Sequence, residues 1–151
     1  MVRLEGTHDL PLPPAELRPL LADPAFLVAC VPDVEAVLAC APDGATLRVR
    51  PGLSFVRGAL DVVLRVLDSP DADNVHVAAL SSKGIGSTSE LVAVLALAGE
   101  GDGTRVHWSV DVIKLGGLLK LVPPGLIHGA AKQIITDAWE RVSERVKRPQ
   151  A

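Results

Sequence analysis

The chain ends in the pattern of one long amphipathic helix, and this helix restricts what the rest can fold into. Apolar residues recur at steps of three and four from about Gly125 to Val146, which places them on one face of an α-helix. At 1.5 Å per residue, this helix would be about 33 Å long, enough to span a small domain. Its apolar stripe needs a broad surface to cover. The stripe consists of Ile127, Ala130, Ala131, Ile134, Ile135, Ala138, Trp139, Val142 and Val146.

The middle of the chain supplies such a surface as a series of strands. Apolar and polar residues alternate there, which is typical of antiparallel strands with one buried face. Asp43-Gly44 predicts a hairpin turn with positive φ, and further breaks are predicted at 69–71, 84–86 and 99–103. His76 and His107 fall on the predicted outward phase. The predicted inward residues are Leu60, Val62, Leu64, Val66, Val75, Val77, Ala79, Leu91, Ala93, Leu95, Leu97, Val106, Trp108, Val110 and Val112.

Two short helices are predicted between a first strand at 2–10 and the hairpin. Prolines open the first helix, where a missing N–H costs nothing, and Asp23 is placed to cap the second helix at 25–30. The length of 151 residues suits one domain. We therefore predict a single α+β domain over 1–151. In this prediction, two short helices close one end of a curved antiparallel sheet of about seven strands, and the long helix lies across the apolar face of that sheet.

The inward positions carry small side chains, which bears on what lies between sheet and helix. A curved sheet cannot touch a straight helix along its whole length, and this chain offers Val, Leu and Ala there, with only 3% aromatic residues overall. One interpretation is an apolar cavity of the size that binds small molecules. The alternative is a closer approach of the helix and a solid core, because native interiors usually pack densely.

Composition argues against several classes of protein. A net charge of -3 and the scarcity of aromatic residues disfavour a nucleic-acid partner. Cys30 and Cys40 are expected to be buried and reduced, and no spacing of Cys and His suggests a metal site. The N-terminus has no apolar segment of the signal-peptide kind, and the longest apolar run, Leu91 to Ala98, is too short to cross a membrane. We expect a cytoplasmic protein without a cofactor.

Several short motifs occur in a particular order and spacing: Asp23-Pro24 with Ala29-Cys30-Val31-Pro32, Pro51-Gly52-Leu53-Ser54-Phe55-Val56-Arg57-Gly58, Lys83-Gly84-Ile85-Gly86-Ser87, and Gly103-Thr104-Arg105-Val106 through Leu115-Gly116-Gly117-Leu118. Together these motifs resemble the CoxG family, which is named after the CoxG subunit of carbon monoxide dehydrogenase. That family belongs to the SRPBCC or START-like superfamily, whose fold is called the helix-grip. The resemblance covers roughly residues 2 to 146.

The resemblance implies a hydrophobic cavity between sheet and C-terminal helix and no shared catalytic constellation. It also implies an accessory role beside molybdenum hydroxylases of the carbon monoxide dehydrogenase type, through membrane attachment or a quinone-like partner. Two departures matter. Many relatives continue into an apolar anchor, whereas this sequence stops at Ala151, so stable anchoring is not expected. Relatives often have Gly where Asp33 stands, so the conformation of that loop is left open.

The predicted site follows from these patterns. A quinone- or lipid-like molecule would be held by Leu64, Leu95, Trp108, Val110, Leu126, Ile127, His128, Ala131, Ile134 and Ile135. The apolar segment 114–127 has glycines and basic flanks. It is either a gate that touches a transient membrane surface or a partner, or a loop that packs on the two short helices. The gate residues would be Leu115, Leu118, Leu119, Lys114 and Lys120.

A cyclase- or hydrolase-type enzyme of the same superfamily is the alternative. It would need inward polar groups, for which the candidates are Arg57, Glu90 and His128, with Lys83 nearby. Lys83 to Ser87 lacks the spacing of a phosphate-binding loop and is interpreted as a tight connection between strands. With no nucleophile and base in a recognisable motif, a binding protein is the prediction.

Overall fold

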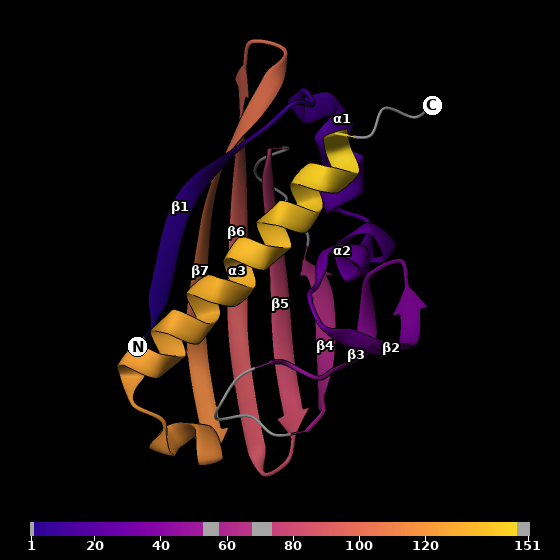
Figure 1. The fold of residues 1–151 in the computed structure, drawn as a ribbon. Helices are drawn as coiled ribbons and strands as arrows, with labels where there is room; N and C mark the ends of the chain where they lie inside the picture. The colour runs from indigo at the N-terminus through magenta and orange to yellow at the C-terminus, as the bar shows by residue number, and fades with distance from the viewer. Residues whose placement is uncertain (1, 53–57, 68–73, 148–151) are drawn as a thin grey trace.

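The computed structural model describes residues 2–52, 58–67 and 74–147. Seven strands form one sheet in the order β1-β7-β6-β5-β4-β3-β2, and every neighbouring pair is antiparallel (Figure 1). The strands are β1 (Arg3–Leu10), β2 (Val34–Ala41), β3 (Gly44–Val49), β4 (Leu60–Leu67), β5 (Val75–Gly84), β6 (Ser87–Glu100) and β7 (Gly103–Gly117). The helices are α1 (Pro14–Leu21), α2 (Pro24–Cys30), the 3-10 helix η1 (Leu118–Leu121) and α3 (Pro124–Lys147).

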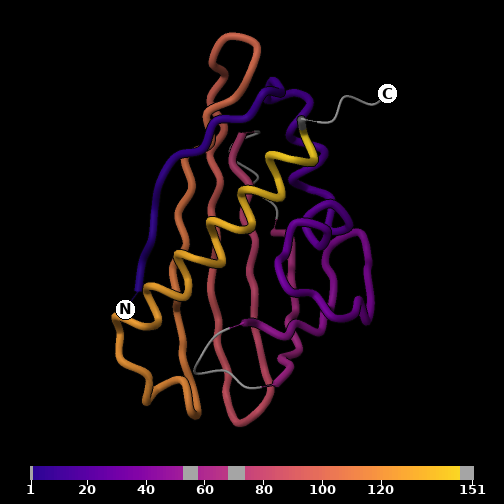
Figure 2. Tube along the Cα trace, viewed as in Figure 1, coloured from indigo at the N-terminus to yellow at the C-terminus, as the bar shows by residue number. Residues whose placement is uncertain are grey.

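Helix α3 runs diagonally across one face of the sheet, which confirms the predicted fold class (Figures 1 and 2). It begins beside η1 at one end of the sheet and finishes beside α1 and α2 at the other. The Asp23 carboxylate accepts a hydrogen bond from the Ala25 backbone N–H at 3.0 Å, as predicted for a cap of α2. The predicted break at 69–71 lies outside the described residues.

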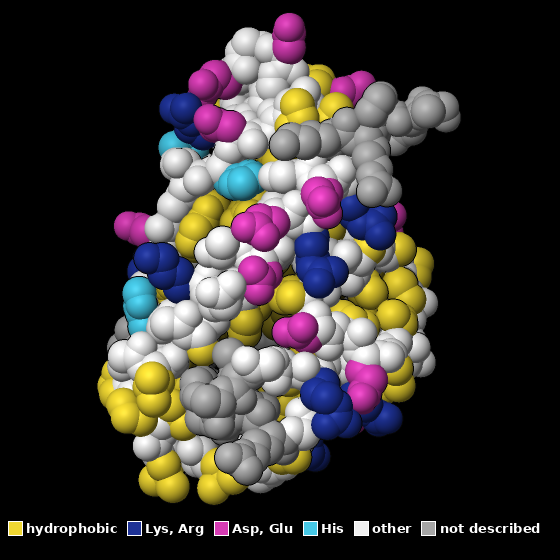
Figure 3. Space-filling view, viewed as in Figure 1, with side chains coloured by type: hydrophobic (Ala, Val, Ile, Leu, Met, Phe, Trp, Pro, Cys, Tyr) yellow, Lys and Arg dark blue, Asp and Glu magenta, His cyan; other side chains and the backbone are white. Residues whose placement is uncertain are grey.

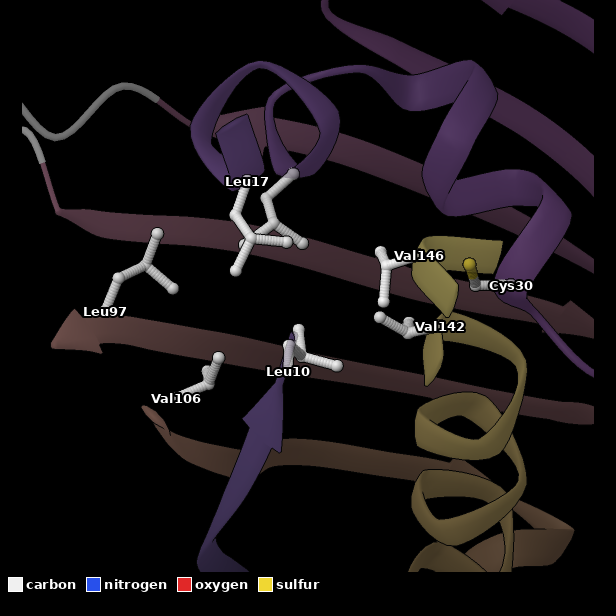
Figure 4. Close-up of a cluster of buried hydrophobic side chains, with 8 residues drawn as sticks. Leu10, Leu17, Cys30, Leu97, Val106, Val142 and Val146 are labelled. Atoms are coloured by element: carbon white, nitrogen blue, oxygen red, sulfur yellow. The ribbon is translucent and has the colours of Figure 1, made fainter. Parts of the chain in front are cut away.

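The largest buried cluster lies where α1, α2 and the end of α3 meet the sheet (Figure 4). A second cluster joins the start of α3 to β4 and η1, and a third lies under α2 on β3. The large cluster contains Leu10, Leu17, Leu21, Cys30, Leu97, Val106, Val142 and Val146. The second contains Leu60, Leu119 and Ile127, and the third Ala45, Leu47 and Val49. The packed core is therefore divided among the ends and one edge of the sheet.

Strand register fixes which residues face α3, since directly paired residues share a face. One row across the sheet runs Ala45, Leu64, Leu80, Leu91 and Val112, of which Ala45, Leu64 and Val112 are fully buried. The predicted phases of β4, β6 and β7 agree with this row.

The predicted phase of β5 is wrong. His76, Ala78 and Leu80 face inward, because their partners on β6 are Leu95, Ala93 and Leu91. The predicted inward residues Val75, Val77 and Ala79 therefore lie on the outer face. Both faces of β5 carry apolar side chains, so alternation alone could not choose between them.

The β2–β3 hairpin forms at the predicted turn, but its glycine serves a different purpose. Gly44 does not have the positive φ that was expected. A Cβ there would instead overlap the Leu64 carbonyl oxygen of β4, so the close approach of two strands excludes a side chain. Asp33, in the loop before β2, has φ 62 and so adopts the left-handed conformation that glycine favours.

The two cysteines lie in different environments. Cys30 is buried in the largest cluster, and burial raises the pKa of its thiol to about 11. Cys40 is exposed on β2, at the edge of the sheet, so the prediction that both are buried is wrong for Cys40. Both are free thiols, as predicted.

Candidate ligand-binding site

The backbone of helix α3 makes its closest approaches to β1 at one edge of the sheet and to α2. No comparable approach to β4, β5, β6 or β7 is found among the described residues. The short helices come closer, α1 to β6 and α2 to β3 and β4.

The inner residues in the middle of the sheet are only half-buried, although they point toward α3. They belong to none of the three packed clusters. Yellow apolar side chains are accordingly visible beneath and beside α3 in Figure 3. We call these residues the central surface: Ala78, Leu80, Leu91, Ala93 and Val110 from the sheet, and Ala131 and Ile135 from α3. It combines small and medium apolar side chains of the sheet and of the helix that crosses it.

A polar contact fastens α3 to β1 at the border of this region. The His8 ring stacks on Trp139 with centroids 4.8 Å apart, and His8 Nε2 hydrogen-bonds to the Ser143 hydroxyl at 2.6 Å. Burial lowers the pKa of His8, an effect that the Asp9 carboxylate opposes. Asp9 itself pairs with Arg105 at 2.9 Å, so it does not orient the imidazole as a catalytic carboxylate would. The pair therefore suits attachment of the helix better than nucleophilic catalysis.

The predicted ligand-binding residues divide into three groups. Val110, Ala131 and Ile135 belong to the central surface, and Leu64 is buried directly beside it, paired with Leu80. Leu95, Trp108 and Ile127 pack at its ends against the buried clusters. Leu126, His128 and Ile134 occupy exposed positions on α3.

Trp108 has a partner that the sequence did not indicate. A Cβ at Gly6 would lie 2.8 Å from Cζ2 of the Trp108 ring, so the indole occupies the place that a side chain at this position of β1 would need. This contact holds the ring toward one end of the sheet. Ala78, Leu80 and Leu91 were not among the predicted site residues, because the register that brings them together is not visible in a single strand's pattern.

The segment 114–127 turns some of its side chains inward and leaves others in solvent. Leu119 is buried against Leu60 and Ile127, with Leu115 packed beside them. The alternative that this segment packs on the two short helices is wrong, since α1 and α2 lie at the opposite end of the sheet (Figure 1). We call the exposed side chains the apolar tip: Ile85, Leu118, Leu121 and Leu126. Leu121 is 80% exposed.

Exposed lysines belong to the same segments as the apolar tip, which lies toward the lower end of Figure 3. Lys83, Lys114 and Lys120 are all exposed. Glu90, the backbone register partner of Lys114 on the neighbouring strand, is exposed as well. Lys83 and Glu90 therefore lie on the surface. Arg57, the other polar candidate, lies outside the described residues.

Two surface hollows lie outside the central surface. One, of about 500 Å³, is lined by α2 and β2 residues such as Val28 and Val34. The other, of about 740 Å³, is lined by His8 and polar residues of α3 such as Glu140. Neither hollow is lined by a predicted ligand-binding residue. In the described ranges there is no group of three or more metal-ligating side chains, and no helix there is both long and apolar enough to cross a membrane.

Known proteins with solved structures share this fold. A conserved protein from Geobacillus kaustophilus superposes with a TM-score of 0.83 at 18% identity, over 97% of this chain and 95% of that one. A START superfamily protein from Mycobacterium smegmatis gives a TM-score of 0.67 at 14% identity, over 96% and 97%. The protein Ara h 8.0201 gives 0.67 at 12%, over 96% and 97%. At such identities the likeness establishes the fold alone.

No curated protein matches the chain by sequence. A family model, however, does match it. This family is that of CoxG, a subunit of carbon monoxide dehydrogenase, and the match covers residues 6–147, almost the whole chain. The chain therefore belongs to the CoxG family of carbon monoxide dehydrogenase subunits, with a START-like fold.

Proposed function

We propose that this protein binds or carries an apolar small molecule, of quinone or lipid type, on the central surface between the sheet and α3. The observation that carries the proposal is that Leu80 and Leu91 on the inner face of the sheet, and Ala131 on the helix that crosses this face, remain half-buried. Apolar side chains in a filled interior would be closed off from solvent. A ligand that covers them removes that exposure.

The energetics allow reversible binding. A ligand that buries about 400 Å² of apolar surface gains roughly 10 kcal/mol at ~25 cal/mol per Å², before the costs of association. Those costs consume at least about 4 kcal/mol, which leaves at most about 6 kcal/mol, a dissociation constant of roughly tens of micromolar or weaker. A carrier needs this range, because it must also release its cargo.

The apolar tip is the contact that we propose for a membrane surface or a partner protein. Leu118, Leu121 and Leu126 are exposed beside the start of α3, and Lys114 and Lys120 flank them. Exposed apolar side chains with basic neighbours favour shallow, reversible contact with anionic lipid. Since Leu115 and Leu119 connect this tip to the inner cluster, a ligand could be exchanged there.

Membership of the CoxG family supports an accessory role beside a molybdenum hydroxylase of the carbon monoxide dehydrogenase type. In this role the protein performs no catalysis. It brings an apolar molecule to the enzyme or takes one away. The geometry at His8 and Ser143 agrees with such a role, because that pair is used to hold α3 on β1.

The site is tested by filling it. Ala131→Phe places a ring in the proposed binding space, and Gln133→Phe adds the same ring on the exposed side of α3. Each purified protein is incubated with phosphatidylglycerol vesicles that contain decylubiquinone, separated from the vesicles, extracted and examined by mass spectrometry. We expect Ala131→Phe to retain at least about tenfold less quinone than the wild type, equivalent to about 1.4 kcal/mol.

Gln133→Phe should retain as much quinone as the wild type, which separates a blocked site from a general effect of a new ring. Thermal unfolding of Ala131→Phe adds a second criterion. A ring entering open space leaves the melting temperature nearly unchanged, whereas overpacking a solid core costs about 1–3 kcal/mol. A wild type that takes up no quinone and no vesicle lipid would contradict the proposed function.

A further inference from the structure

His76 lies on the inner face of the sheet, at one end of the central surface. It pairs with Leu95 of β6, which in turn pairs with Trp108 of β7. Leu95 and Trp108 both pack against the largest buried cluster. His76 is therefore an ionisable side chain placed among apolar ones, at the end of the sheet that α1 covers.

The Nε2 atom of His76 is buried and has no hydrogen-bond partner within the described part of the chain. Leaving a buried polar atom unpaired is costly, and the great majority of such atoms in folded proteins are paired. Burial, and to a lesser extent the Arg18 guanidinium on α1, lower the pKa of His76. The ring is thus neutral at pH 7, with one nitrogen as donor and the other as acceptor.

Small apolar side chains lie next to this imidazole on the inner face. The neighbouring inward row consists of Val66, Ala78, Ala93 and Val110. Ala78 is two residues from His76 along β5, or about 7 Å at the rise of an antiparallel strand. A molecule resting on Ala78 and Ala93 would have its end beside the His76 ring, which can turn about χ2 without movement of the backbone.

We propose that His76 recognises the polar group of the bound molecule, an uncharged carbonyl or hydroxyl oxygen on an otherwise apolar body. This inference rests on the proposed function. It adds the chemical class of the ligand and the residue that binds its polar group. A neutral imidazole exchanges a single hydrogen bond with such an oxygen. The apolar remainder of the ligand would lie on Leu80, Leu91 and Ala131, toward the apolar tip.

Two probes of nearly equal shape test this directly. 2-Acetylnaphthalene carries a carbonyl where 2-isopropenylnaphthalene carries a methylene group. Affinities are measured by quenching of tryptophan fluorescence for the wild type and for His76→Leu. We expect the wild type to prefer the ketone by about 3- to 10-fold, the range of one net hydrogen bond. His76→Leu should bind both probes equally, at the affinity of the wild type for the alkene.

Imidazole resonances supply a readout that does not depend on the variant. In a long-range ¹H–¹⁵N spectrum of the wild type, the ketone should shift a ring nitrogen of His76, and the alkene should not. Equal affinities of the wild type for both probes, with no shift, would overturn the inference while leaving the proposed function in place. That result would mean that an ordered water pairs with Nε2. If neither probe binds the wild type, this inference fails, and the quinone-uptake assay described above decides separately whether the proposed function fails.

Discussion

At the scale of single residues, environment decides what a side chain can do. Cys30 and Cys40 are both free thiols, yet one lies in the largest cluster and the other on the edge strand β2. The sequence places both in apolar surroundings, and it could not show that β2 forms an edge of the sheet. His76 was misplaced for a related reason, since its face depends on the partner strand β6.

The two thiols should react at very different rates. At pH 8 the exposed Cys40 is expected to react with a maleimide within minutes, because the thiolate is the nucleophile and Cys40 is accessible. Cys30 should stay unlabelled, since burial raises the pKa of its thiol to about 11. Intact-mass spectrometry should therefore find one adduct on the native protein and two in denaturant. Two adducts under native conditions would contradict the burial of Cys30.

At the scale of elements, periodicity predicted most of the helices and strands, and pairing settled the rest. The stripe of α3 and the alternation in β6 and β7 each define a single apolar face, so the inward face of these elements was correctly predicted. Strand β5 has apolar residues on both faces, so its own sequence does not define its inner side. The predicted stripe of α3 also included Ile134, which is exposed.

The β2–β3 hairpin and α3 offer matched glycine substitutions. Gly44→Ala would drive a Cβ into the Leu64 carbonyl oxygen, so we expect a loss of about 1–3 kcal/mol in the free energy of unfolding. Gly129 lies in α3, where a Cβ would have nothing within 4 Å of it. Gly129→Ala should therefore add about 0.5–1 kcal/mol through helix propensity. Urea unfolding of both variants checks the two signs, and a stabilising Gly44→Ala would contradict the register of β3 and β4.

At the scale of the whole molecule, the sequence predicted the architecture but not how the core is divided. The order of elements and the long final helix were enough to predict a sheet gripping a helix. Three separate clusters pack its ends and one edge, and the central surface stays half-buried between them. The small inward side chains suggested that the interior is not packed evenly. They could not establish how closely α3 approaches the sheet, and this distance determines whether the interior is open or filled.

The most direct test of that division is the location of a bound apolar molecule. Intermolecular nuclear Overhauser effects can be recorded from 2-acetylnaphthalene to protein labelled at the methyl groups of Ala, Leu and Val. We predict cross-peaks to Leu80, Leu91 and Ala131, and none to the fully buried Leu17 and Leu47. Cross-peaks confined to Leu118, Leu121 and Leu126 at the apolar tip, or none at all, would contradict the claim that the space between α3 and the sheet receives a ligand.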